Sequence, residues 1–282
     1  RDLVRFFVSF EGKYLDLIIF QDSYMGGLLF KLKILIKAVR NLENWYVFPL
    51  VYFGLIRKQF VNFNTKSGLK IKLRTDSTDL ETFSLIWLLK DYNKFDFIVN
   101  SNDIIIDVGA HIGIFSLYMH QFCIHGKIFC YEPYKENFEL LNDNIKQNEI
   151  KNIFPKNCAV SKSNDEVTLY LNPDKTANSM YNITSETITV PSTTLQNIFD
   201  SNKLEICNYL KLDCEGAEYD IIESLPEEYF KKIEKIYIEY HFSDSKSLLL
   251  ENMIKKLESV SFRIINEPME QGMGSIFAMK KN

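Results

Sequence analysis

The chain has 282 residues, of which 46% are hydrophobic, so it can fill the core of one large domain or of a domain with an appendage. Its formal net charge of −4 argues against nucleic acid as the main partner, because binding phosphates requires a basic face. Five cysteines without a Cys-x-x-Cys pair favour reduced thiols, and we expect a cytoplasmic protein. The sequence contains no run of about 18 uncharged apolar residues, so we predict no transmembrane segment.

The N-terminal part, residues 1–58, shows no glycine-rich nucleotide loop and is predicted to be a mainly helical extension of the domain formed by residues 59–282. Its segment from Trp45 to Ile56 is rich in aromatic side chains and is followed by Arg57 and Lys58. We expect a helix packed on the main domain. The alternative is peripheral contact with a membrane surface, which aromatic and basic residues also suit.

A hairpin is predicted next, because Phe60–Phe63 and the alternating segment 69–73 flank a Lys-Ser-Gly turn. The polar run 76–79 offers N-caps for a helix over 80–89. From residue 103 onward, strands and helices alternate, which is typical of a parallel sheet covered on both faces.

The fold class is therefore predicted to be α/β, with a doubly wound, mostly parallel seven-stranded sheet. The expected strands are 104–108, 128–131, 153–160, 209–212, 235–240, 262–265 and 275–279. The expected helices are 112–122, 134–147, 193–199, 217–225 and 246–259, and a hairpin (166–171 and 187–190) with a polar loop over 172–182 interrupts the alternation.

The segment Asp107-Val-Gly-Ala-His-Ile-Gly113 has the pattern of a strand, a tight glycine turn and a helix. A dinucleotide loop places its second glycine where the backbone approaches a pyrophosphate, whereas this chain has His111 at that position. Asp107 would also repel phosphates. The loop therefore favours a cationic nucleoside without phosphate, S-adenosyl-L-methionine, over NAD.

A second acid, Glu132, ends the next predicted strand 23 residues after Gly109. An acid about 20 residues beyond the glycine turn accepts the ribose hydroxyls in nucleotide-binding α/β folds. Glu132 therefore supports a nucleoside cofactor without distinguishing between candidates.

Two further acidic clusters lie at the ends of later strands. Asp213, Glu215 and Glu218 follow the strand over 209–212, and the next strand ends in Glu239 and His241. Side chains two residues apart on a strand share a face, so Glu239 and His241 should point together. We hypothesise that His241 or Asp213 accepts the proton of an acceptor hydroxyl, with Glu215 and Glu239 orienting that base or the acceptor.

These motifs together resemble the FkbM-type family of S-adenosylmethionine-dependent methyltransferases. The resemblance rests on Arg74 to Asp79 with Tyr92, Asp107 to Gly113, Glu132-Pro133 with Asn144, Val190 to Leu195, Asp213 to Glu218, and Glu239 to His241. It implies a class I Rossmann-like fold and methylation of hydroxyl oxygens on sugars, natural products or other small acceptors. It also implies roles for individual positions. Asp107, Gly109, Ala110 and Gly113 would hold the amino-acid part of the cofactor, Glu132 the ribose, Ala159 and Val160 the adenine, and Asp79 would close the pocket.

The sequence therefore predicts an O-methyltransferase acting on a saccharide or a glycosylated small molecule, without a metal ion, because no carboxylate cluster for Mg²⁺ stands out. The alternatives are an N-methyltransferase, an enzyme for a lipid-linked or polyketide acceptor, a non-catalytic cofactor-binding module, or an NAD-dependent dehydrogenase. Nothing in the sequence specifies the acceptor or the oligomeric state.

Overall fold

The centre of the computed structural model, which describes residues 27–95, 97–171, 186–270 and 272–281, is a seven-stranded sheet. The strand order is β11-β12-β10-β9-β3-β4-β5. The strands are β3 (Ile104–Val108), β4 (Lys127–Tyr131), β5 (Ile153–Lys156), β9 (Tyr209–Asp213), β10 (Lys235–Tyr240), β11 (Phe262–Pro268) and β12 (Gly274–Lys280). The neighbouring pairs from β10 to β5 are parallel, and β12 is antiparallel to β10 and β11. The predicted doubly wound, mostly parallel sheet is confirmed.

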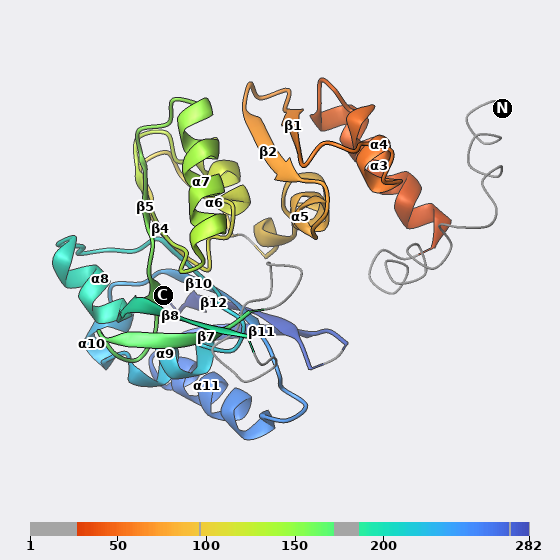
Figure 1. Ribbon diagram of the computed structural model, residues 1–282. Coiled ribbons are helices and arrows are strands. Elements are labelled where there is room, and N and C mark those ends of the chain that lie inside the picture. The colour runs from red at the N-terminus through yellow and green to blue at the C-terminus, as the bar shows by residue number, and fades with distance from the viewer. Residues whose placement is uncertain (1–26, 96, 172–185, 271, 282) are drawn as a thin grey trace.

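Helices cover both faces of this sheet (Figure 1). On one face lie α6 (Ile114–His120) and α7 (Lys135–Gln147), and on the other α8 (Leu195–Ser201), α9 (Glu218–Ser224), α10 (Glu227–Phe230) and α11 (Ser247–Ser259). Two hydrophobic clusters correspond to the two faces, and neighbouring residues of β3 contribute to different ones: Ile105 to the first and Ile106 to the second. This is the alternation expected of a strand that is buried on both sides.

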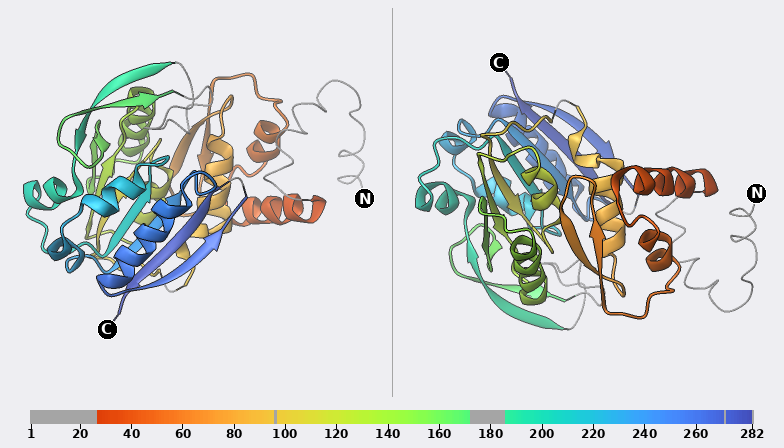
Figure 2. Two further views of the ribbon diagram at one scale, coloured as in Figure 1. Left: turned by 90° about the horizontal axis from the view of Figure 1, so that it is seen from below. Right: turned by 90° about the horizontal axis from the view of Figure 1, so that it is seen from above.

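The N-terminal elements lie beside the layer of α6 and α7, and α3 extends away from the domain (Figure 2). They are α3 (Leu28–Asn41), α4 (Val47–Tyr52), the hairpin β1 (Phe60–Asn64) and β2 (Lys70–Arg74), α5 (Asp79–Phe83), the π-helix η1 (Ser84–Leu89) and the 3₁₀ turn η2 (Asp91–Asn93). The predicted hairpin is confirmed. The predicted helix over 80–89 is present, but it changes from α to π geometry at Ser84.

A small separate sheet has the order β6-β8-β7, formed by β6 (Ala159–Val160), β7 (Glu166–Tyr170) and β8 (Thr187–Thr193). The predicted hairpin is thus confirmed, whereas the single strand expected over 153–160 is wrong. It divides into β5 and β6 because the chain turns between them, where the Asn157 side chain donates to the carbonyl oxygens of Glu132 and Pro133. The predicted loop over 172–182 lies outside the described residues.

Within the described ranges, we find no helix with both the length and the apolar character needed to cross a membrane.

Candidate active site

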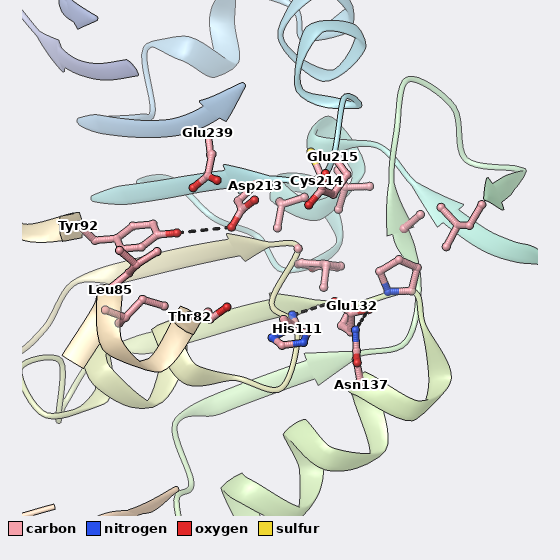
Figure 3. Close-up of a pocket in the computed structure, with 18 residues that line it drawn as sticks. Thr82, Leu85, Tyr92, His111, Glu132, Asn137, Asp213, Cys214, Glu215 and Glu239 are labelled. Carbon is pink, nitrogen blue, oxygen red and sulfur yellow. Dashed lines mark hydrogen bonds between the residues drawn. The ribbon is translucent and has the colours of Figure 1, made fainter. Parts of the chain in front are cut away.

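A cavity lies at the carboxyl ends of β3, β4, β9 and β10, where the strand order changes direction (Figure 3). Ligands of open α/β sheets bind at this position. Its lining combines strand-end acids with apolar and aromatic side chains: Thr82, Leu85, Ile86, Tyr92, Val108, Gly109, His111, Tyr131, Glu132, Pro133, Asn137, Ala159, Val160, Leu169, Asp213, Cys214, Glu215 and Glu239.

Acids from neighbouring strands face this cavity. Asp213 ends β9 and is paired in register with Glu239 on β10. Figure 3 shows these two on one side of the cavity and Glu132 on the other. The Tyr92 hydroxyl donates to Asp213 Oδ2 over 3.4 Å. Parallel strand ends have thus gathered residues from distant parts of the chain around one space.

The glycine turn after β3 requires a residue without a side chain at its first position. Gly109 has φ +75°, and a Cβ there would collide with the carbonyl oxygen of Asp213. His111 also adopts a positive φ of 51°, and its amide donates to Glu132 Oε2 over 2.8 Å. The turn therefore brings the tips of β3, β4 and β9 together.

Beneath the turn lies a buried lysine on β9. The Lys211 ammonium is 3.2 Å from Asp107 Oδ1 and 3.2 Å from Asp213 Oδ2, and it donates to the Gly109 carbonyl oxygen over 3.0 Å. Burial opposes its charge, but the two carboxylates outweigh burial and raise the lysine pKa. The side chain of Asp107 also accepts from the Ser116 hydroxyl at 2.7 Å, so it is held below the turn rather than in the cavity lining.

Glu132 is buried, and burial outweighs the hydrogen bonds that favour its charged form. Its oxygens accept from the amides of His111 and Tyr134, at 2.8 and 2.9 Å. Burial nevertheless raises the pKa of Glu132 to about 7. A buried carboxyl of this kind gains from a hydrogen-bonding ligand in the cavity.

His241 lies behind the cavity wall among three glutamates. Its Nδ1 is 3.4 Å from Glu218 Oε1, and its Nε2 is 3.5 Å from Glu215 Oε2 and 3.9 Å from Glu239 Oε1. Burial opposes protonation, but the carboxylates outweigh it and hold the pKa of His241 well above its usual value. This environment favours the protonated imidazole.

The two glutamates between His241 and the cavity are themselves perturbed. Burial raises the pKa of Glu215 to about 8, against the opposing effect of His241. Burial and the nearby Asp213 charge raise the pKa of Glu239 to about 7. Perturbed acids that line a cavity are typical of catalytic sites.

A second buried ion pair joins the N-terminal hairpin to the cavity rim. Arg74 and Asp79 form a bidentate pair, with Nη2 to Oδ1 at 2.8 Å and Nε to Oδ2 at 2.9 Å. Arg74 also contacts Asn137 Oδ1 and His111 Nε2 at 2.9 and 2.8 Å. Burial, together with Arg74, lowers the pKa of His111 to about 4, so this histidine is neutral.

Of the residues expected to form the site, seven line the cavity: Gly109, Glu132, Ala159, Val160, Asp213, Glu215 and Glu239. Five lie close to it without lining it: Asp79, Asp107, Ala110, Gly113 and His241. Asp79 and Asp107 are fully buried in ion pairs with Arg74 and Lys211. Gly113 packs against Leu141, where a side chain would collide.

Sequence reasoning assigned no role to several residues that the structure brings to the site. Lys211 is the most informative, because a lysine inside the otherwise apolar run Tyr209–Leu212 has to find a buried carboxylate. Asn137 and Cys214, unlike Lys211, line the cavity, and they carried no recognisable signal.

The sequence showed no cluster of metal-binding side chains, and the structure corrects this, because such a cluster does form beside the cavity. Ligand atoms of Asp213, Glu239 and His241 lie within 4.8 Å of one another. However, Lys211 is within 3.2 Å of Asp213, and the cationic His241 belongs to the cluster itself. Two protein cations therefore already compensate these carboxylates.

A mostly parallel seven-stranded sheet with an antiparallel strand between β10 and β11, and with an acid-lined cavity at its switch point, is the architecture of class I Rossmann-like methyltransferases. The sequence pattern of the methyltransferase FkbM domain matches residues 107–264, and the chain belongs to this family of methyltransferases.

Two curated relatives are fungal. "Methyltransferase 1" of Beauveria bassiana is 23% identical over 172 residues, which cover 51% of this chain and 69% of the relative. "Methyltransferase sdnD" of Sordaria araneosa is 25% identical over 172 residues, 49% of this chain and 66% of the relative.

Solved structures are similar at lower identity. Methyltransferase FkbM from Methylobacillus flagellatus has a TM-score of 0.45 and 15% identity, over 70% of this chain and 53% of that chain. TYW2 of M. jannaschii, solved in complex with AdoMet, has a TM-score of 0.41 and 13% identity, over 79% of this chain and 85% of that chain.

Proposed function

We propose that this methyltransferase uses S-adenosyl-L-methionine to methylate a hydroxyl group of a saccharide or a glycosylated small molecule. The observation that carries the proposal is the pair of strand-end carboxylates, Asp213 and Glu239, which lie in register beside a cavity that also contains Glu132. The five cysteines are all unpaired, which fits a reducing compartment such as the cytoplasm.

The lining of the cavity fits this cofactor. Among the described residues it holds four carboxylates, from Glu132, Asp213, Glu215 and Glu239, and neither lysine nor arginine. These groups repel phosphates in their charged forms, and a bound cationic nucleoside would in turn favour those charged forms. In our proposal, Glu132 holds the ribose and the apolar pair Ala159 and Val160 flanks the adenine.

The residues next to the lining act indirectly in this proposal. Asp107 fixes Lys211, which in turn holds the Gly109 carbonyl oxygen and Asp213 in place. Asp79 fixes Arg74, which holds His111 in the turn. Ala110 and Gly113 shape the backbone that faces the amino-acid part of the cofactor.

When bound, S-adenosylmethionine supplies a methyl group already activated on a sulfonium. The protein's contribution is to orient the acceptor oxygen, which can lower the barrier by several kcal/mol, up to about 7–11 in the best model systems. The acceptor proton has to leave, and Glu239 suits this role best because it faces the cavity and its pKa is about 7. His241, buried and cationic, would position Glu215 and Glu239 rather than accept the proton.

The same lining restricts the acceptor. Hydroxyl groups can form hydrogen bonds with the carboxyl groups of Asp213, Glu215 and Glu239, whereas a carboxylate or phosphate near the reacting oxygen would be repelled by those that are charged. A polyhydroxylated acceptor therefore fits. Amine, lipid-linked and polyketide acceptors are the alternatives that the assay has to include.

The test has two arms. Calorimetry should show binding of S-adenosylmethionine and S-adenosylhomocysteine, and tight binding of NAD instead would overturn the proposal. Methyl transfer, corrected for cofactor hydrolysis, is then measured on saccharides, glycosylated metabolites, amines and lipid-linked sugars. Transfer to amines alone would replace the O-methyltransferase assignment, and cofactor binding without transfer to any acceptor would favour a binding module.

A further inference from the structure

Helix α3 buries one apolar stripe and exposes a second. Ile34, Ala38 and Leu42 are buried, and α3 packs against η1. Leu32, Ile36 and Val39, spaced by four and three residues, are 40%, 52% and 39% exposed. Residues at this spacing share one side of a helix. A helix that only packs on its own domain needs the first stripe but not the second.

The segment that follows α3 also exposes large apolar side chains. Eight of the eighteen exposed large apolar side chains in the described ranges fall between residues 32 and 55: Leu32, Ile36, Val39, Trp45, Tyr46, Leu50, Phe53 and Leu55. α4 contacts α3, and the Lys31 ammonium lies over the Tyr52 ring at 5.9 Å. Apolar exposure is thus concentrated at the N-terminal end of the described chain, where α3 extends from the domain (Figure 2).

The charge of this region is opposite to that of the rest of the protein. Residues 28–58 contain six basic residues and one acid, a net charge of +5, whereas the whole chain carries −4. Lys33, Lys37 and Arg40 lie one position after the exposed apolar residues Leu32, Ile36 and Val39 and form a neighbouring stripe. α3 contains no acidic residue.

We infer that α3 and the segment up to Leu55 form a surface that docks on an anionic lipid bilayer. Apolar side chains beside a basic stripe are the combination that holds a helix in the plane of a membrane interface. The anionic bilayer would repel the acidic remainder of the protein, so membrane contact is restricted to this end of the molecule. The inference does not depend on which acceptor is methylated.

Flotation of the full chain with vesicles tests this surface. We expect binding to phosphatidylcholine mixed with phosphatidylglycerol, weaker binding to phosphatidylcholine alone, and a loss of binding as salt is raised. The double variant Lys33→Gln with Lys37→Gln should weaken binding about fivefold for each cation removed. The matched control Lys151→Gln with Lys255→Gln removes two exposed lysines elsewhere and should bind as wild type.

The apolar stripe is tested by Leu32→Gln with Ile36→Gln, compared with Leu248→Gln with Leu249→Gln on α11, where both side chains are also exposed. The α3 variant should lose most vesicle binding at an unchanged melting temperature, and the α11 variant should keep it. If the α3 and α11 variants bound vesicles equally well, the inference would be overturned, and the membrane-binding surface would have to lie elsewhere in the chain. If the wild-type chain did not bind anionic vesicles, the inference would also be overturned, and a partner other than a membrane, such as a second copy of the chain, would have to cover the apolar stripe.

Discussion

Glu239 is the side chain on which the proposed chemistry depends most directly. It has to be deprotonated to accept the acceptor proton, and burial together with Asp213 raises its pKa to about 7. We therefore expect turnover to rise with pH through about 7 and to fall in acid. Glu239→Gln should lower turnover by about 10²- to 10⁴-fold and remove the acid limb of the pH profile, while S-adenosylhomocysteine binding is retained.

The control for this variant is Glu258→Gln, an exposed change on α11 that should leave turnover and its pH profile unaltered. Wild-type turnover in the Glu239→Gln enzyme would exclude Glu239 as the base. Asp213 and Glu215, which also line the cavity, would then be the remaining candidates, because His241 is enclosed by glutamates that favour its protonated form.

Lys211 should matter for stability as well as for the site. Its removal leaves Asp107, whose side chain is fully buried, with Ser116 as its remaining side-chain donor among the contacts described. Breaking a buried ion pair in this way costs about 3–5 kcal/mol, so Lys211→Met should lower the free energy of unfolding by this amount. Lys255→Met, which removes an exposed pair with Glu251, should change it by about 1 kcal/mol or less. Denaturant titration measures both, and equal losses would contradict the proposed role.

A divalent cation is not expected to assist, although Asp213, Glu239 and His241 lie within 4.8 Å of one another. A metal ion there would be repelled by the Lys211 ammonium and by the imidazolium. Turnover should therefore survive EDTA, and added Mg²⁺ or Mn²⁺ should not raise it. Loss of activity in EDTA that is restored by one of these ions would show that the imidazole gives up its proton to bind the metal.

The acids of the site could be predicted because parallel strands end at one edge of a sheet, which brings Asp213, Glu239 and Glu132 together. The shared side of Glu239 and His241, expected from strand alternation, agrees with their 3.9 Å separation. The sequence could not predict how deeply each of these side chains is buried. Alternation says which way a side chain points, but His241 is also enclosed by Glu215, in the turn after β9, and by Glu218, at the start of α9.

Among the elements, α5 is held to the rest of the fold by the Arg74–Asp79 pair, which is buried on both sides. Asp79→Asn should therefore lower the free energy of unfolding by about 3–5 kcal/mol, because it leaves a buried guanidinium without its carboxylate. If Asp79 acts through Arg74, cofactor affinity falls equally in Arg74→Met. Thermal unfolding and calorimetry with S-adenosylhomocysteine measure the two effects.

The matched control is Asp143→Asn, which removes the exposed pair between Lys72 on β2 and Asp143 on α7. It should cost no more than about 1 kcal/mol. A loss of cofactor binding in Asp79→Asn without a loss of stability would instead support a direct contact between Asp79 and the cofactor.

The strands and helices that the sequence predicted well are those with a continuous apolar pattern between turn signals. β3, β4 and β10 begin and end within a residue of the expected positions. Two features involve distant contacts and left no local signal. The π-helix η1 contains Trp87, whose Nε1 donates to the Ile114 carbonyl oxygen. Between β5 and β6, the Asn157 side chain donates to the carbonyl oxygen of Glu132, the residue after β4.

At the scale of the whole molecule, the N-terminal helices share their core with the main domain. Ile34, Ala38 and Leu42 belong to the same hydrophobic cluster as Phe63, Trp87 and Ile105. The described residues of the predicted N-terminal extension thus share one hydrophobic core with the Rossmann-like fold. This bears directly on how the chain unfolds, because elements that share a core unfold together.

Ala38→Asp tests this cooperativity in the full chain. It places a charge at a fully buried position between α3 and the domain, which costs several kcal/mol when no partner is present. We expect a single unfolding transition in the wild type and a shift of that whole transition to lower temperature in the variant, with weaker binding of S-adenosylhomocysteine. Lys33→Asp, at an exposed position of the same helix, should leave the transition within about 0.5 kcal/mol of the wild type. If Ala38→Asp melted α3 alone and left the main transition unchanged, residues 28–58 would be a separate unit.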